Sequence, residues 1–214
     1  MLSYPRCGSS FVRYCVENLL KRPTLDCGGR RDQVYGDPIQ YKSNIPILRK
    51  EHFIKGINTK VEKLILLVRN YKDSFISHNL RNLDLEKEVD VMYEKLSEAE
   101  NFFAEYYNLL DYYDKFEKDK LIIYYDELIQ EPQFSVQKIL NFLEPGYKVQ
   151  TDLEKLKNES QQKYKQRGGL KTEKIKHLHK IFTEEQNNEL DMIFRENNEY
   201  LYDKYLSENI MGIK

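Results

Sequence analysis

The segment YPRCGSSF, residues 4–11, combines a cation, two hydroxyl groups and a glycine in a short turn. A strand-like stretch precedes the turn and a helical apolar pattern follows it. Gly8 lets the backbone bend without a Cβ clash. Ser9 and Ser10 stand at or near the start of the helix, where backbone N–H groups lack partners. With Arg6, these groups could cradle an anion, although an ordinary capped strand–helix turn would use the same residue types.

A second segment with anion-binding chemistry, VRNYKDSFIS, covers residues 68–77. Arg69 follows an apolar run at residues 63–68, and ligands of open α/β sheets bind at the carboxyl ends of strands. The planar guanidinium suits phosphate oxygens. Ser77 lies eight residues further on, about two turns into the expected helix. The alternative is that Arg69 pairs with Asp73 and caps this helix.

Strand and helix patterns alternate along the chain and must position these two segments. Residues 63–68 and 120–124 are short apolar runs without helical periodicity, which is typical of strands buried on both faces. Residues 46–48 are a weaker strand candidate. The alternation predicts an α/β fold of three layers, α/β/α, around a central parallel sheet. Because no repeat or low-complexity linker interrupts the pattern, we expect a single domain over residues 1–214.

Helical patterns lie between the strand candidates. Apolar residues repeat at helical spacing over residues 11–20, 136–143 and 190–194. Residues 84–119 are acidic and rich in Tyr and Phe without Pro or Gly, which predicts one long helix or two, as a helical insertion or cover. Residues 161–180 are rich in Lys, and this local positive charge favours an anionic ligand.

Composition excludes several classes of function. The chain of 214 residues has 34 Lys and Arg against 35 Asp and Glu, a net charge of −1, so a globally basic nucleic-acid binder is disfavoured. No apolar run approaches the roughly 18–20 residues of a membrane helix, and the start lacks a charged leader followed by an apolar stretch. We therefore expect a cytoplasmic protein without a membrane span or a nucleic-acid partner.

Histidine and cysteine patterns do not indicate a metal site. The cysteines, Cys7, Cys15 and Cys27, are odd in number and form no CxxC pair, which argues against a disulfide scaffold and a zinc site. His177 and His179 are two residues apart, so on a helix they would face different ways. No carboxylate or cysteine stands in suitable register with them. The sequence therefore predicts no bound metal.

Taken together, the two segments resemble the sulfotransferase family that uses 3′-phosphoadenosine 5′-phosphosulfate (PAPS). In that family a loop of the type Tyr-Pro-Lys/Arg-Ser-Gly-Thr/Asn-Thr/Ser-Trp holds the 5′-phosphosulfate. A second segment, Val-Arg-Asn-Pro-x-Asp followed by Ser, holds the 3′-phosphate. YDEL at residues 125–128 looks like the family's Tyr-Glu-Asp-Leu segment, and RGGL at residues 167–170 looks like the Arg-Lys-Gly segment that closes over the 3′-phosphate. The resemblance spans roughly residues 2–191.

This resemblance implies a fold like that of P-loop-containing nucleotide hydrolases and a transfer of the sulfuryl group from PAPS to a hydroxyl acceptor. The product of PAPS would be 3′-phosphoadenosine 5′-phosphate (PAP), and no metal is required. Carbohydrate, small alcohol, lipid and protein tyrosine all remain open as acceptors, and the oligomeric state is unknown. The implied nucleotide-binding residues are Arg6, Cys7, Gly8, Ser9, Ser10, Phe11, Arg69, Ser77, Tyr125, Arg167, Gly168 and Gly169.

A general base is also implied by the resemblance. In the cytosolic branch of the family a strand ends in Lys-Thr-His, with the histidine as base, and this chain has Lys50, Glu51 and His52. We expect His52 to be the base, because an unperturbed imidazole titrates near neutral pH. Lys50 would lie close to the sulfonate, and Arg6 would stabilise the leaving phosphate oxygen. Glu51 is the rival base, since other branches use a carboxylate.

Several positions depart from the family pattern. Arg6 stands where many members have Lys, Cys7 where Ser is usual, Phe11 where Trp is usual, Tyr71 in place of Pro, and Gly168 in place of Lys. These changes keep open a non-catalytic module that binds PAP. A small-molecule kinase is a further alternative, against which the absence of a G-x-x-x-x-G-K-[ST] loop argues.

Overall fold

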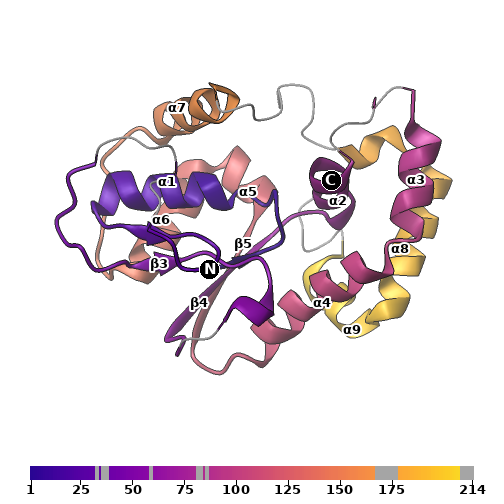
Figure 1. The fold of residues 1–214 in the computed structure, drawn as a ribbon, viewed down its shortest axis with the longest axis horizontal. Coiled ribbons are helices and arrows are strands. Elements are labelled where there is room, and N and C mark those ends of the chain that lie inside the picture. Colours follow the sequence, from indigo (N-terminus) through magenta and orange to yellow (C-terminus); the bar gives the residue numbers. More distant parts are fainter. Residues whose placement is uncertain are drawn as a thin grey trace. The chain divides into compact units, whose positions relative to one another are not determined.

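The computed structural model describes residues 1–31, 34, 39–57, 60–80, 84, 87–166 and 178–207. The chain divides into two compact units (Figure 1). The first unit consists of Met1–Val68 and Phe116–Lys171, and the second of Arg69–Lys115 and Thr172–Lys214. Among the described residues, no helix is long and apolar enough to cross a membrane.

A parallel sheet forms the centre of the first unit. Strand β4 pairs with β1 on one side and with β5 on the other. A parallel bridge between Leu2 and Glu51 continues the pairing towards β3, which itself pairs with β2. The five side chains from Leu64 to Val68 are all buried, as expected for a strand covered on both faces. The strands are β1 (Leu2–Ser3), β2 (Thr24–Leu25), β3 (Leu48–Arg49), β4 (Lys63–Val68) and β5 (Asp119–Tyr124).

Helices flank this sheet (Figure 1). Most apolar side chains of residues 11–20 and 136–143 are buried, as their spacing predicted, whereas Leu19 and Leu143 are half-buried. The two helices contact one another. The second of these helices begins at Pro132, which suits a first helical position, and packs on β5. The helices of the first unit are α1 (Ser9–Leu20), the 3₁₀ helix η1 (Ile54–Gly56), α5 (Tyr125–Gln130), α6 (Pro132–Leu143) and α7 (Leu153–Gln166).

A buried polar cluster fixes α1 against β2. Arg13 Nε donates to Thr24 Oγ1 at 2.7 Å, and the Thr24 hydroxyl donates to Glu17 Oε1 at 2.5 Å. The three residues are each at most 5% exposed. Burial raises the pKa of Glu17, which its hydrogen bonds and Arg13 oppose. Because these groups bond to one another, the helix that follows the loop at residues 4–11 is held in one position.

The second unit is helical around an aromatic core. Phe194 is fully buried, and Tyr71 stacks on it with ring centroids 3.8 Å apart. Tyr107 and Phe103 contact the same ring at 4.6 and 5.0 Å, so the aromatic residues of the acidic segment fill this core. The described residues of that segment form two helices, one of the alternatives that the sequence left open. The helices are α2 (Tyr71–Asn79), α3 (Val89–Ser97), α4 (Glu100–Lys115), η3 (Leu178–Ile181), α8 (Glu184–Asn197) and α9 (Glu199–Tyr205).

Candidate active site

The loop at residues 4–11 has an unusual backbone. Gly8 is the N-cap of α1 with φ 86°, and Arg6, which is not a glycine, has φ 73°. A non-glycine residue in this left-handed region costs about 1–2 kcal/mol and is found preferentially at functional sites. No side chain caps the helix at Gly8. The helix therefore starts at Ser9 and Ser10 without a side-chain cap, and binding of an anion by their N–H groups stays a prediction.

The loop glycine is packed against a second segment that the sequence singled out. A Cβ atom at Gly8 would lie 3.0 Å from Leu128 Cδ2 and 3.4 Å from Tyr125 Cδ2. Both residues belong to α5, which starts directly after β5. The first unit thus brings the loop at residues 4–11 together with Tyr125, one of the predicted nucleotide-binding residues.

Replacing Gly8 with alanine is expected to lower the free energy of unfolding by about 1–3 kcal/mol, since the new Cβ adds a close contact to a strained φ. Urea denaturation measures this loss. Gly146→Ala is a matched control, because Gly146 has φ 82° and no atom within 4 Å of its Cβ position. The control carries backbone strain alone, so equal losses in the two variants would contradict the packing of α5 on the loop.

His52 is oriented by the backbone of β1. Its Nδ1 lies 2.7 Å from the Ser3 carbonyl oxygen and 3.4 Å from Ser3 Oγ. A carbonyl oxygen only accepts hydrogen bonds, so Nδ1 carries the proton. In the neutral ring Nε2 is then the basic nitrogen. Since Ser3 directly precedes the loop at residues 4–11, the imidazole is tied to the strand end that leads into the loop.

The two residues before His52 have different environments. Glu51 is buried, and its Oε1 lies 2.6 Å from both Nε and a terminal nitrogen of Arg49. This ion pair occupies the carboxylate that the sequence offered as the rival base. Burial lowers the pKa of Lys50, whereas the nearby Cys27 acts in the opposite direction. Contact of Lys50 with a sulfonate stays a prediction.

Arg69 begins the second unit and is 5% exposed. Its backbone carbonyl accepts a hydrogen bond from the Tyr106 hydroxyl. The cap of α2 comes from Asn70, whose Oδ1 accepts from Lys72 N at 3.0 Å and from Asp73 N at 3.4 Å. The alternative that Arg69 pairs with Asp73 is met by an ion pair of 3.9 Å between them. The cap itself is Asn70, which was not predicted, although asparagine directly before a helix is a strong N-cap signal.

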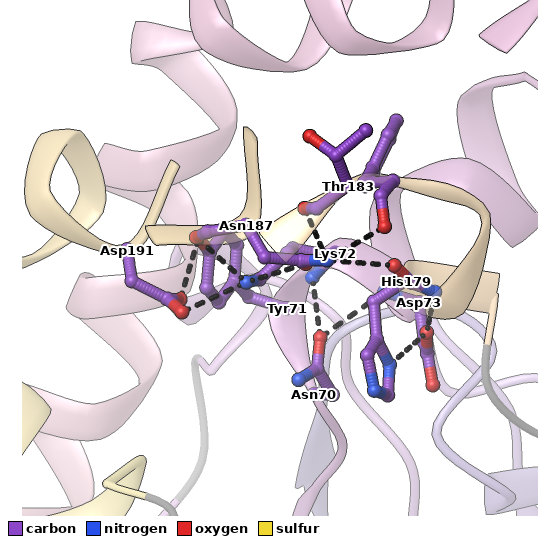
Figure 2. A network of polar contacts seen from close by, with 9 residues as sticks. Asn70, Tyr71, Lys72, Asp73, His179, Thr183, Asn187 and Asp191 are labelled. Atoms are coloured by element: carbon purple, nitrogen blue, oxygen red, sulfur yellow. Dashed lines mark hydrogen bonds and ion pairs between the residues drawn. The ribbon is translucent and has the colours of Figure 1, made fainter. Parts of the chain in front are cut away.

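A network of polar contacts ties the first turn of α2 to α8 (Figure 2). Lys72 Nζ donates to Asp191 Oδ2 at 2.8 Å and to Asn187 Oδ1 at 3.0 Å. The Tyr71 hydroxyl donates to Asp191 Oδ1 at 3.0 Å, and burial raises the pKa of Tyr71. Tyr71, which departs from the family's proline, thus fixes the start of α2 by stacking on Phe194 and bonding to Asp191.

Comparison with known proteins identifies the family. A family model for the sulfotransferase domain matches residues 1–203. The chain belongs to the sulfotransferase family. Among solved structures, mouse sulfotransferase SULT7A1 complexed with PAP matches with a TM-score of 0.61 at 18% identity, over 95% of this chain and 87% of that chain. The match confirms the predicted α/β fold with a central parallel sheet flanked by helices. Comparison with curated protein sequences gave no match.

The remaining predicted residues of this sulfotransferase fall into three groups. Cys7 and Phe11 are buried in the first unit, and Ser77 is buried on α2 in the second.

Among the residues that the structure describes, no group of three His, Cys, Asp or Glu side chains could hold a metal ion. Arg167, Gly168, Gly169 and His177 lie outside the described residues.

Proposed function

We propose that this sulfotransferase transfers the sulfuryl group of PAPS to a hydroxyl acceptor, with His52 as general base. The observation that carries the proposal is the 2.7 Å contact from His52 Nδ1 to the Ser3 carbonyl oxygen. Because Nδ1 donates to this oxygen, Nε2 is the nitrogen that can accept a proton. The same bond ties the imidazole to the strand that leads into the loop at residues 4–11. The ion pair of Glu51 with Arg49 supports His52 over the rival base. The cytoplasmic location stays a prediction from the sequence.

In the proposed reaction the acceptor oxygen attacks sulfur in line while His52 Nε2 takes the hydroxyl proton. The bond between sulfur and the bridging oxygen breaks, and PAP leaves with the negative charge on its 5′-phosphate. Arg6 and the N–H groups of Gly8, Ser9 and Ser10 would stabilise that charge. A guanidinium stays protonated, so the contribution of Arg6 is electrostatic rather than a proton transfer.

The sulfuryl transfer itself is tested with PAPS and a panel of saccharides, small alcohols, lipids and tyrosine peptides. Mass spectrometry is expected to detect a product carrying one added sulfuryl group, together with PAP. PAP binding without transfer to any acceptor would instead support a non-catalytic PAP-binding module. Absence of PAP binding by calorimetry would contradict both functions.

Arg69 and Ser77 are proposed to bind the 3′-phosphate, with Arg167 as a further ligand. We expect Arg69→Ala to weaken PAP binding by about 1.5–3 kcal/mol, the contribution of a hydrogen bond to a charged group. Isothermal titration calorimetry measures the change. Arg195→Ala is the control, because Arg195 is a half-exposed arginine of the same unit that pairs with Glu199 and Asp203. Equal affinity of the Arg69 variant and the wild type would remove Arg69 from the site.

A further inference from the structure

The loop at residues 39–47 carries the most exposed large apolar side chain among the described residues. Ile45 is 68% exposed, although isoleucine is one of the residue types most often buried. Tyr41, Pro46 and Ile47 of the same loop are half-buried. Single apolar side chains are common on protein surfaces, so the surroundings of Ile45 decide whether it marks an interaction site.

Hydrogen bonds hold this loop at both ends. The backbone N–H of Lys42 donates to the Lys21 carbonyl oxygen at 2.8 Å, and that of Ile47 donates to the Pro23 carbonyl oxygen at 3.1 Å. The acceptors directly follow the last residue of α1. Ile45 is therefore displayed to solvent by a loop that is bonded to the first unit on either side of it.

Four cationic side chains surround the loop. The guanidinium of Arg22 donates to the Ile45 carbonyl oxygen at 3.2 Å, and the guanidinium of Arg31 donates to the preceding carbonyl oxygen. Both of these hydrogen bonds are exposed to solvent. Lys21 and Lys42, which are joined through their backbones, add two ammonium groups. The exposed apolar side chain thus lies among positive charges.

The same part of the chain has few negative charges. No carboxylate belongs to residues 20–25 or 39–47. Asp26, the next acidic residue after the first of these ranges, pairs with Arg30 at 3.2 Å. Residues 20–47 hold five Lys and Arg against three Asp, so this segment is positive although the whole chain has a net charge of −1. An apolar side chain among cations is the chemistry of surfaces that bind anionic lipids.

We propose that the loop at residues 39–47 is a contact surface for an anionic membrane. Ile45 enters the headgroup region, and the four cations attract the negatively charged lipids. An acidic protein also matches the charge, but one aliphatic side chain on an irregular loop lacks the closely packed core of a protein interface. A lipid surface requires no such packing. Contact of this kind is distinct from crossing a membrane and goes beyond the proposed sulfuryl transfer.

Co-sedimentation of the full chain with vesicles tests the proposal, with phosphatidylcholine alone compared with phosphatidylcholine plus phosphatidylserine. Binding is expected only with phosphatidylserine and is expected to weaken with salt, which screens exposed charges. Ile45→Ser is expected to weaken binding about tenfold, because the side chain that enters the headgroup region is lost. Lys42→Gln is expected to weaken it about fivefold, the contribution of one cation near an anionic membrane.

Phe134→Ser and Lys115→Gln are the matched controls. Phe134 is a 53% exposed apolar side chain on α6 of the same unit, and Lys115 is an exposed lysine that pairs with Asp111. Neither control is expected to change vesicle binding. The Ile45 and Lys42 variants are expected to keep the wild-type melting temperature, because they alter exposed side chains and leave the backbone hydrogen bonds of the loop in place.

Absence of binding to the phosphatidylserine vesicles would overturn the proposal, and so would binding that the Ile45 variant retains in full. A loss in the Lys42 variant alone would indicate recognition by charge without insertion, as an acidic protein would show. Self-association in sedimentation velocity that Ile45→Ser abolishes would instead assign the surface to a second copy of the chain. The vesicle assay contains no PAPS, so its outcome is independent of the proposed function.

Discussion

Replacing His52 with alanine is expected to lower turnover by about 10²–10⁴-fold, the usual contribution of general acid–base catalysis. The alanine variant keeps the loop at residues 4–11, so its affinity for PAP is expected to match that of the wild type. The physical reason is the single basic nitrogen, Nε2, that remains when Nδ1 donates to the Ser3 carbonyl oxygen. Steady-state sulfuryl transfer and PAP calorimetry on the same preparations measure the two quantities.

Glu51→Gln provides the comparison for this prediction, because glutamine keeps the size of the rival base and removes its charge. The variant loses the ion pair with Arg49 and is expected to lower thermal stability while the folded protein keeps most of its turnover. Full turnover in the His52 variant, with a large loss in the Glu51 variant, would transfer the role of base to Glu51.

Replacing Asp191 with alanine is expected to lower the free energy of unfolding by about 3 kcal/mol, because it leaves a buried charge without its counter-ion. The side chain of Lys72 is 4% exposed, and Asp191 Oδ2 lies 2.8 Å from its Nζ. The same substitution removes the acceptor of the Tyr71 hydroxyl. Urea denaturation, with the midpoint and slope both recorded, measures the loss.

Two further variants test whether the buried charge causes this loss. Lys72→Met in the Asp191→Ala background replaces the ammonium with an apolar side chain of similar length and is expected to recover much of the stability. Glu199→Ala breaks a solvent-exposed ion pair with Arg195 in the same unit and is expected to cost less than about 1 kcal/mol. A double variant as unstable as the single one would show that the hydrogen bond to Tyr71, rather than the charge, dominates.

Strand β4 and the turn at Gly8 were predicted from the sequence, whereas the left-handed backbone of Arg6 was not. After Lys63, the run KLILLV has no polar side chain on either face. Such a run is typical of a strand that is covered on both faces of its sheet. Strand β2 was not predicted, because its two residues are too few to show a periodic pattern. The cap of α2 was not predicted, because Arg69, Asn70 and Asp73 all carry polar groups near the helix start. Residue types alone do not show which of these groups bonds to the helix N–H groups.

The sequence by itself determined the composition of the loop at residues 4–11, the strands β4 and β5, and the resemblance to sulfotransferases. Each of these depends on the types of residues that are close together in the sequence, so it can be predicted without knowing the tertiary structure. Only the tertiary structure decided which nitrogen of His52 is basic and that the Asp73 carboxylate contacts His179 Nδ1. Those contacts join residues that are 49 and 106 positions apart. Their formation depends on how β1, α2 and η3 are held by the rest of their units, and that information is absent from any short stretch of the chain.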